Sequence, residues 1–85
     1  MDNMRTKDNW EKFYSKVSGE DIVFVSEIFS LLPKRYKEII EYRFGLKDGV
    51  FKTLEETGKK FGITRERVRQ VEERSIKLIR GVKNN

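Results

Sequence analysis

The sequence has no cysteine and no histidine among its 85 residues. Their absence excludes disulfide bridges, thiolate or imidazole metal sites, and catalysis by a cysteine or histidine side chain. The longest apolar run, Ile22–Val25, is far shorter than the roughly 20 residues that cross a bilayer. The first ten residues also lack the apolar stretch of a signal peptide. We therefore expect a cytoplasmic, non-enzymatic protein with no cofactor, metal or membrane partner.

Charged side chains are abundant and unevenly distributed. They make up 39% of the residues, against roughly 25% in an average soluble domain. Residues 1–50 carry nine basic and nine acidic side chains, whereas residues 51–85 carry ten basic and five acidic ones, which accounts for the whole net charge of +5. This asymmetry indicates a neutral packing half and a half that binds a polyanion. A basic surface that is merely solvated is the alternative.

Apolar residues recur at helical spacing along the chain, which predicts an all-α fold of four to five short helices. We divide the chain into an N-terminal extension, residues 1–19, and a domain, residues 20–85. The extension carries an apolar stripe made of Trp10, Phe13, Tyr14 and Val17. We expect this stripe to pack on the domain as an extra helix; docking on a partner is the alternative.

The segment Asp21–Leu32 is unusually apolar, with eight apolar residues among twelve. One helix face in a small domain cannot bury so many, so we expect part of this segment to contact a partner. Pro33 suits the first position of the next helix, because its missing N–H would have no partner there. Gly45 is expected to end that helix.

The C-terminal part predicts a helix-turn-helix. Thr53–Glu56 forms a capping box that starts a short helix, Leu54–Lys60. Thr64 is the expected N-cap of a last helix, Arg65–Arg80, which Gly81 ends.

Two glycines support this interpretation. Gly58 lies where the two helices approach too closely for a large side chain, and Gly62 lies where the turn requires a positive φ. An αα-hairpin with no role in DNA binding is the alternative.

The last helix has an apolar face and a polar, mostly basic face. A recognition helix presents its N-terminal side chains to base edges in the major groove. Arginine can bind guanine, glutamine can bind adenine, and glutamate can accept a hydrogen bond from cytosine. The candidate base-contacting residues are Arg65, Glu66, Arg69 and Gln70.

Glu66 distinguishes base recognition from simple electrostatic attraction, because a carboxylate that faces phosphates lowers affinity. We interpret Glu66 as a base contact or as a residue that orients Arg69; an ordinary i,i+3 ion pair is the alternative. The N–H groups of Thr53 and Leu54 at a helix start can also bind a phosphate. Side chains suited to phosphates flank the helix: Lys52, Thr53, Arg67, Arg74 and Lys77.

The run from Thr53 to Arg74, TLEETGKKFGITRERVRQVEER, resembles region 4.2 of the housekeeping-type sigma-70 factors of bacterial RNA polymerase. The preceding run Leu32–Gly49, LPKRYKEIIEYRFGLKDG, resembles region 4.1 and its following loop. The resemblance implies a winged-helix-like domain without a clear wing that binds the −35 promoter element. Under it, the base-contacting positions are Arg65, Glu66, Arg69 and Gln70, and the positions at or near the DNA backbone include Thr53, Leu54, Glu55, Arg67 and Arg74.

The resemblance also implies a surface that binds RNA polymerase. In the family, region 4.1 forms an apolar groove that holds the flap-tip helix of the polymerase β subunit. Anti-sigma factors and activators are further expected partners. The residues that would form this surface are Phe24, Ile28, Phe29, Leu32 and Tyr36.

We therefore expect binding of −35-like promoter DNA and docking on the β-flap, as a sigma-like subunit or an isolated sigma domain. The regions that read the −10 element are absent, so a separate protein would supply them. Glu73 and Ser75 depart from the family, which commonly has alanine at both positions. Two alternatives stay open. One is a stand-alone regulator that dimerises through Asp21–Leu32; the other is an adaptor that binds polymerase or an anti-sigma factor without contacting DNA.

Overall fold

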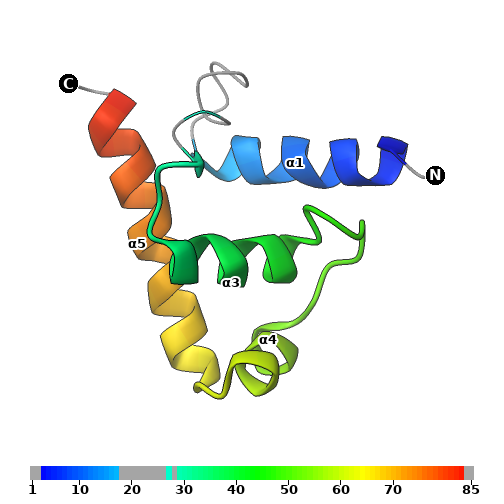
Figure 1. The fold of residues 1–85 in the computed structure, drawn as a ribbon, viewed down its shortest axis with the longest axis vertical. Coiled ribbons are helices and arrows are strands. Elements are labelled where there is room, and N and C mark those ends of the chain that lie inside the picture. Colours follow the sequence, from blue (N-terminus) through cyan, green and yellow to red (C-terminus); the bar gives the residue numbers. More distant parts are fainter. Residues whose placement is uncertain (1–2, 18–26, 28, 84–85) are drawn as a thin grey trace.

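The computed structural model describes residues 3–17, 27 and 29–83. These residues form helices joined by turns: α1 (Asn3–Val17), α3 (Lys34–Phe44), α4 (Leu54–Phe61) and α5 (Arg65–Lys83). The expected all-α fold is therefore confirmed. In Figure 1, α1 and α3 lie side by side, α5 runs steeply past their left-hand ends, and α4 lies against the N-terminal end of α5. None of the described helices is long and apolar enough to cross a membrane.

Helix boundaries differ from the sequence prediction at three places. Pro33 precedes α3 as its N-cap, with φ −52° and ψ 142°, rather than being its first helical residue. The short helix α4 continues one residue further, to Phe61. Helix α5 passes Gly81 and ends at Lys83, because one glycine costs a helix only about 1 kcal/mol.

The larger of two core clusters lies between α1, α3 and α5. Phe13 is fully buried, and its ring makes edge contacts with Phe29 (5.7 Å between centroids) and Phe44 (5.3 Å). Trp10 adds a third edge contact, 5.2 Å from Phe29. Edge-to-face geometry is favourable for aromatic pairs beyond the burial of their area. The buried members of the cluster are Phe13, Val17, Phe29, Leu32, Ile40, Phe44, Leu46 and Ile79.

Polar contacts also hold α1 in place. Asn9 Nδ2 donates to the buried carbonyl of Gly45, at 3.2 Å. At the other end of the helix, Arg80 Nε donates to the Val17 carbonyl at 2.6 Å, which satisfies an orphan carbonyl of the last turn. Lys16 Nζ lies 2.8 Å from the largely buried carboxylate of Glu72. The N-terminal helix is thus tied to α3 and α5 at several points.

The smaller core cluster supports the helix-turn-helix. It consists of Ile39, Val68 and Val71, with Tyr36, Leu54, Phe61 and Ile63 packed against it. These side chains come from α3, α4, the turn and α5, so they fix the two C-terminal helices on the α3 platform.

Ser75 is a buried polar residue of α5 that the fold leaves unsatisfied. Its side chain is 0% exposed, and its Oγ has no hydrogen-bond partner among the described residues. An unsatisfied buried hydroxyl is unfavourable, and alanine is the better helix former. We expect Ser75→Ala to raise the free energy of unfolding by about 1 kcal/mol, measured by urea denaturation. Exposed Ser15 in α1 is the matched control, and a gain no larger than that of Ser15→Ala would contradict the prediction.

Candidate nucleic-acid interface

The start of α4 is fixed by the predicted capping box. Thr53 Oγ1 accepts a hydrogen bond from the Glu56 N–H at 3.0 Å, and Glu56 Oε1 accepts one from the Thr53 N–H at 2.8 Å. The capping box therefore occupies the Thr53 N–H, which is not free for a phosphate as the sequence suggested. The N–H groups of Leu54 and Glu55, in the first turn, are the remaining candidates for a phosphate.

The turn between α4 and α5 has the geometry expected from its glycines. Gly62 adopts the left-handed conformation, with φ 70° and ψ 34°. A Cβ on Gly58 would lie 2.6 Å from the carbonyl oxygen of Ile63, so α4 lies too close to the backbone of the turn that leads into α5 for any side chain there. Thr64 Oγ1 accepts from the Arg67 N–H at 3.0 Å and caps α5. Both glycine predictions and the Thr64 cap are confirmed.

The outward face of α5 exposes all four predicted base-contacting residues: Arg65, Glu66, Arg69 and Gln70. The opposite face enters the core through four side chains that are at most 2% exposed, whereas Leu78 on the same side is 44% exposed. The four are Val68, Val71, Ser75 and Ile79. The predicted split of α5 into a polar face and a packing face is therefore confirmed. That the exposed residues contact bases stays a prediction.

Arg69 lies between two carboxylates of its own helix. Its Nε is 3.2 Å from Glu66 Oε1, its Nη2 also pairs with Glu66, and its Nη1 is 2.5 Å from Glu73 Oε2. The hydrogen bond from Arg69 lowers the pKa of Glu66, and the hydrogen bond to Glu66 raises the pKa of Arg69. In the free chain, Glu66 thus forms the i,i+3 ion pair and at the same time orients Arg69. The pair with Glu73 was missed from the sequence, although the i,i+4 spacing signals it.

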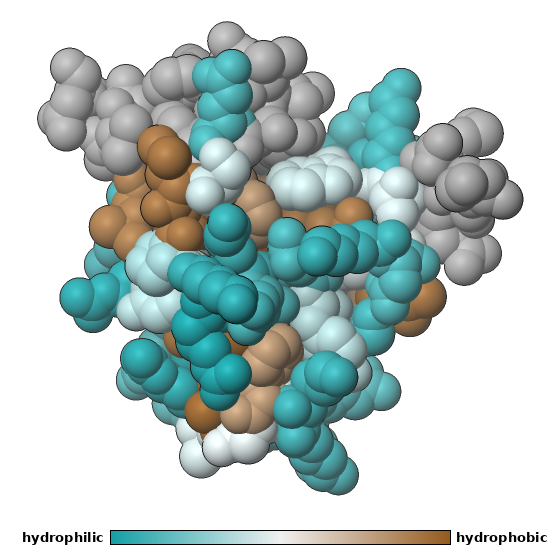
Figure 2. Space-filling view, viewed as in Figure 1, coloured by the Kyte–Doolittle hydropathy of each residue, from teal (hydrophilic) through white to brown (hydrophobic). Residues whose placement is uncertain are grey.

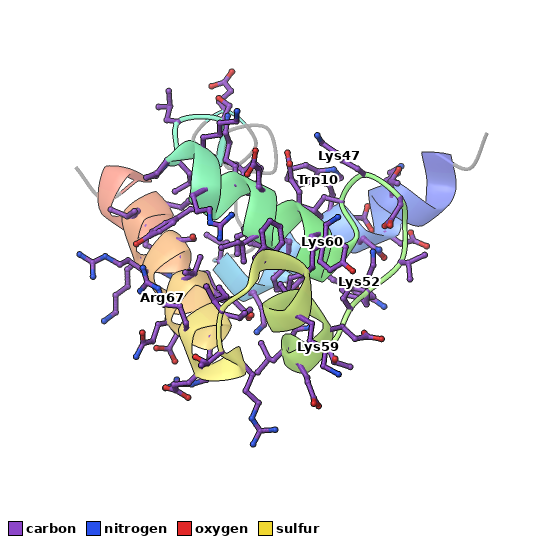
Figure 3. The ribbon with its side chains drawn as sticks, turned by 60° about the horizontal axis from the view of Figure 1, so that its bottom comes forward. Trp10, Lys47, Lys52, Lys59, Lys60 and Arg67 are labelled. Carbon is purple, nitrogen blue, oxygen red and sulfur yellow. The ribbon has the colours of Figure 1, made fainter. Side chains whose placement is uncertain are left out.

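Exposed cations extend from this face along α5. Arg67, Arg74 and Lys77, which we predicted to lie near phosphates, line one shallow depression together with Gln70 and Glu73. Figure 3 shows Arg67 on the outer side of α5. Side chains in these positions can approach a DNA backbone without rearrangement of the helix.

Lys52 differs from the other predicted phosphate contacts because its ammonium already has partners. Its Nζ lies 2.7 Å from Asp48 Oδ2, 2.8 Å from the Val50 carbonyl and 4.5 Å from the centre of the Tyr42 ring. The hydrogen bond from Lys52 lowers the pKa of Asp48. The Lys52 side chain is only 13% exposed and lies beside α4 in Figure 3. A phosphate would have to compete with these contacts.

The three described residues among those predicted to bind polymerase do not form an exposed apolar surface. Phe29 and Leu32 are 4% and 6% exposed and belong to the core beneath α1, so neither is open to a partner in this structure, and their contact with polymerase stays a prediction. Tyr36 is partly buried, and Phe24 and Ile28 lie outside the described residues. Among the described residues that precede Pro33, Leu31 is an exposed apolar residue, at 77%. In Figure 2 hydrophilic side chains predominate among the coloured residues, and a hydrophobic patch lies at the upper left of the view, beside residues drawn in grey.

Comparison with known proteins agrees with this geometry. The family profile described as Sigma-70, region 4 matches residues 28–81. The RNA polymerase sigma factor SigA of Bacillus sp is 43% identical over 56 residues, which cover 66% of this chain and 15% of that protein. The RNA polymerase sigma factor sigB of Arabidopsis thaliana is 37% identical over 76 residues, covering 81% of this chain and 13% of that protein.

The chain thus corresponds to only 13–15% of the length of these two relatives. No solved structure shows significant similarity to it. The family profile nevertheless covers α3, α4 and nearly all of α5, which together build the helix-turn-helix and its support. The chain therefore belongs to the sigma-70 region 4 family.

Proposed function

We propose that the chain binds −35-like promoter DNA through the outward face of α5, as a sigma-like subunit or sigma domain in transcription initiation. One observation carries the proposal: four side chains able to contact bases stand exposed on the second helix of a capped helix-turn-helix, within the segment that matches region 4. A recognition helix of this kind places its first turns in the major groove. The four are Arg65, Glu66, Arg69 and Gln70.

Binding by the isolated chain is weak under this proposal. A single small domain that neutralises a handful of phosphates has an affinity near the non-specific range, roughly 10⁻⁴–10⁻⁶ M. Docking on polymerase raises the effective concentration of the domain at the promoter and makes weak contacts sufficient. The proposed partners are accordingly promoter DNA and the polymerase core, with an anti-sigma factor or activator as further candidates.

The proposed contact with the β-flap is constrained by α1. A partner helix that contacts Phe29 or Leu32 must first displace Trp10 and Phe13, which pack over that surface. Leu31, exposed beside α3, is accessible without any such displacement. In a pull-down with this chain as bait, Leu31→Glu should therefore lower the amount of polymerase β subunit that is retained. Such a loss would place the contact at the edge of the domain where Leu31 is exposed.

The DNA-binding proposal is tested by selecting duplexes from a random library and measuring affinity for the selected site at fixed salt. We expect Arg69→Ala to weaken that affinity about 5-fold to 150-fold, because a bidentate contact to guanine is lost. Gln70→Ala should relax the preference at one base pair.

Lys34→Ala is the matched control, because Lys34 is a highly exposed cation on α3, outside the proposed interface. It should change the affinity less than twofold. If neither Arg69→Ala nor Gln70→Ala alters the selected sequence or its affinity, the adaptor that does not contact DNA becomes the better interpretation. Two protected half-sites about one helical turn apart would instead favour a dimeric regulator.

A further inference from the structure

The recognition face of α5 contains an acidic group where a DNA-binding helix would be expected to be basic. Glu66, Arg69 and Glu73 together carry a net charge of −1, with each side chain about half exposed. Their neighbours on the helix include the cations Arg65 and Lys77. The two glutamates therefore lower the positive potential around Arg69, the side chain best suited to bind a base.

The two carboxylates bind different edges of the Arg69 guanidinium. Glu66 accepts from Nε and Nη2, whereas Glu73 accepts from Nη1 at 2.5 Å. A guanidinium has five N–H donors in a planar fork, and a guanine needs two of them from one edge. With Glu66 in place, the edge left for a base is the one formed by Nη1 and Nη2. Glu73 binds Nη1, one of the two nitrogens of that edge.

This geometry gives the two glutamates opposite effects. Glu66 holds the Nε edge and leaves the Nη1–Nη2 edge as the one that can face a base, so it assists a base contact. Glu73 holds Nη1 and supplies a negative charge beside it, so its carboxylate competes with a guanine or a phosphate for Arg69. Once released, its carboxylate stands on the DNA-facing side without the arginine that had neutralised it, and it repels the phosphates.

We infer that Glu73 is an affinity-setting residue that competes with DNA for Arg69 and holds the domain in a weakly binding state. This inference rests on the proposed function, because it assumes that α5 faces DNA. Glu73 is then a competitor for DNA that belongs to the DNA-binding helix itself. Weak binding of the free domain then follows from this α5 pairing as well as from the small number of phosphate contacts.

The inference is tested with Glu73→Gln, which removes the charge and keeps the shape of the side chain. We expect affinity for the selected duplex to rise about threefold to tenfold at moderate salt. The slope of log affinity against log salt should steepen by about one unit, as for one additional phosphate contact. Glu38→Gln, the same change on exposed α3, should alter affinity less than twofold.

A double-mutant cycle with Arg69 separates competition from simple repulsion. If Glu73 acts through Arg69, the gain from Glu73→Gln should shrink to less than half in the Arg69→Ala background. An equal gain in both backgrounds, or no gain in either, would overturn the inference. Glu66→Gln should have the opposite effect and weaken binding, because Arg69 loses the partner that orients it.

These outcomes are distinct from failure of the proposed function. If the wild-type chain selects no duplex sequence, the proposed function fails, and the inference fails with it. If the wild type selects a sequence but Glu73→Gln leaves its affinity unchanged, only the competition between Glu73 and DNA is excluded.

Discussion

Replacing Phe13 by alanine is expected to lower the free energy of unfolding by about 3–5 kcal/mol, the range for a fully buried phenylalanine. The side chain is 0% exposed and contacts the rings of Phe29 and Phe44. A domain of this size has a total stability of roughly 4–13 kcal/mol, so the loss is a large part of it. Urea denaturation measures this loss. The fluorescence of Trp10, the only tryptophan, can report the unfolding, because its ring contacts that of Phe13.

Glu11→Ala is the matched control, because Glu11 lies on the exposed side of the same helix. It should change the free energy of unfolding by less than about 0.5 kcal/mol. If Phe13→Ala is no more destabilising than Glu11→Ala, α1 does not pack as described. A large difference would mean that a helix outside the matched family segment, residues 28–81, supplies part of the domain's core.

The contacts of α1 connect this core to the recognition helix. Ile79 is buried in the same cluster as Phe13, and Arg80 donates to the last carbonyls of α1. Both residues belong to the C-terminal half of α5, whereas the candidate base contacts belong to its first turns. Loss of α1 packing should therefore weaken DNA binding by lowering the proportion of molecules that are folded. It should not remove a direct contact with DNA.

The helix-turn-helix could be predicted from the sequence because its signals are local. The capping box joins Thr53 and Glu56, three residues apart, and the Gly62 turn depends on one residue's allowed φ. Interactions of this range are encoded in a few adjacent residues and hardly depend on the rest of the chain. The amphipathic pattern of α5 was equally clear, because one helix face is defined by spacing alone.

The burial of Phe29 and Leu32 could not be predicted in the same way, because burial is a tertiary property. Phe29 and Leu32 looked like excess apolar residues when the segment before Pro33 was considered alone. The stripe that covers them, with Trp10 and Phe13, was visible in the sequence, but nothing in its spacing identified its contact partner. Lys52 shows the same limit, since its cation–π contact with Tyr42 joins two segments on either side of a loop.

Replacing Gly58 by alanine is expected to disturb both folding and DNA binding. The new Cβ would lie 2.6 Å from the Ile63 carbonyl oxygen and 3.3 Å from the Thr64 carbonyl carbon, and both are backbone atoms. Backbone cannot rotate away as a side chain can, so α4 and α5 must move apart. Alanine favours a helix over glycine by about 1 kcal/mol, yet overpacking costs about 1–3 kcal/mol. We expect a net loss of stability, measured by urea denaturation, and a more than tenfold loss of affinity for the selected duplex.

Gly62→Ala separates this close approach from the general effect of losing a glycine in the turn. Gly62 has φ +70°, so alanine is strained there by about 1–2 kcal/mol, but no atom lies within 4 Å of the new Cβ. The helices can then keep their spacing, and the folded variant should bind DNA nearly as the wild type does. Loss of affinity confined to Gly58→Ala would show that α4 positions the first turn of α5 for base contacts. Equal affinities for the two folded variants would contradict that role.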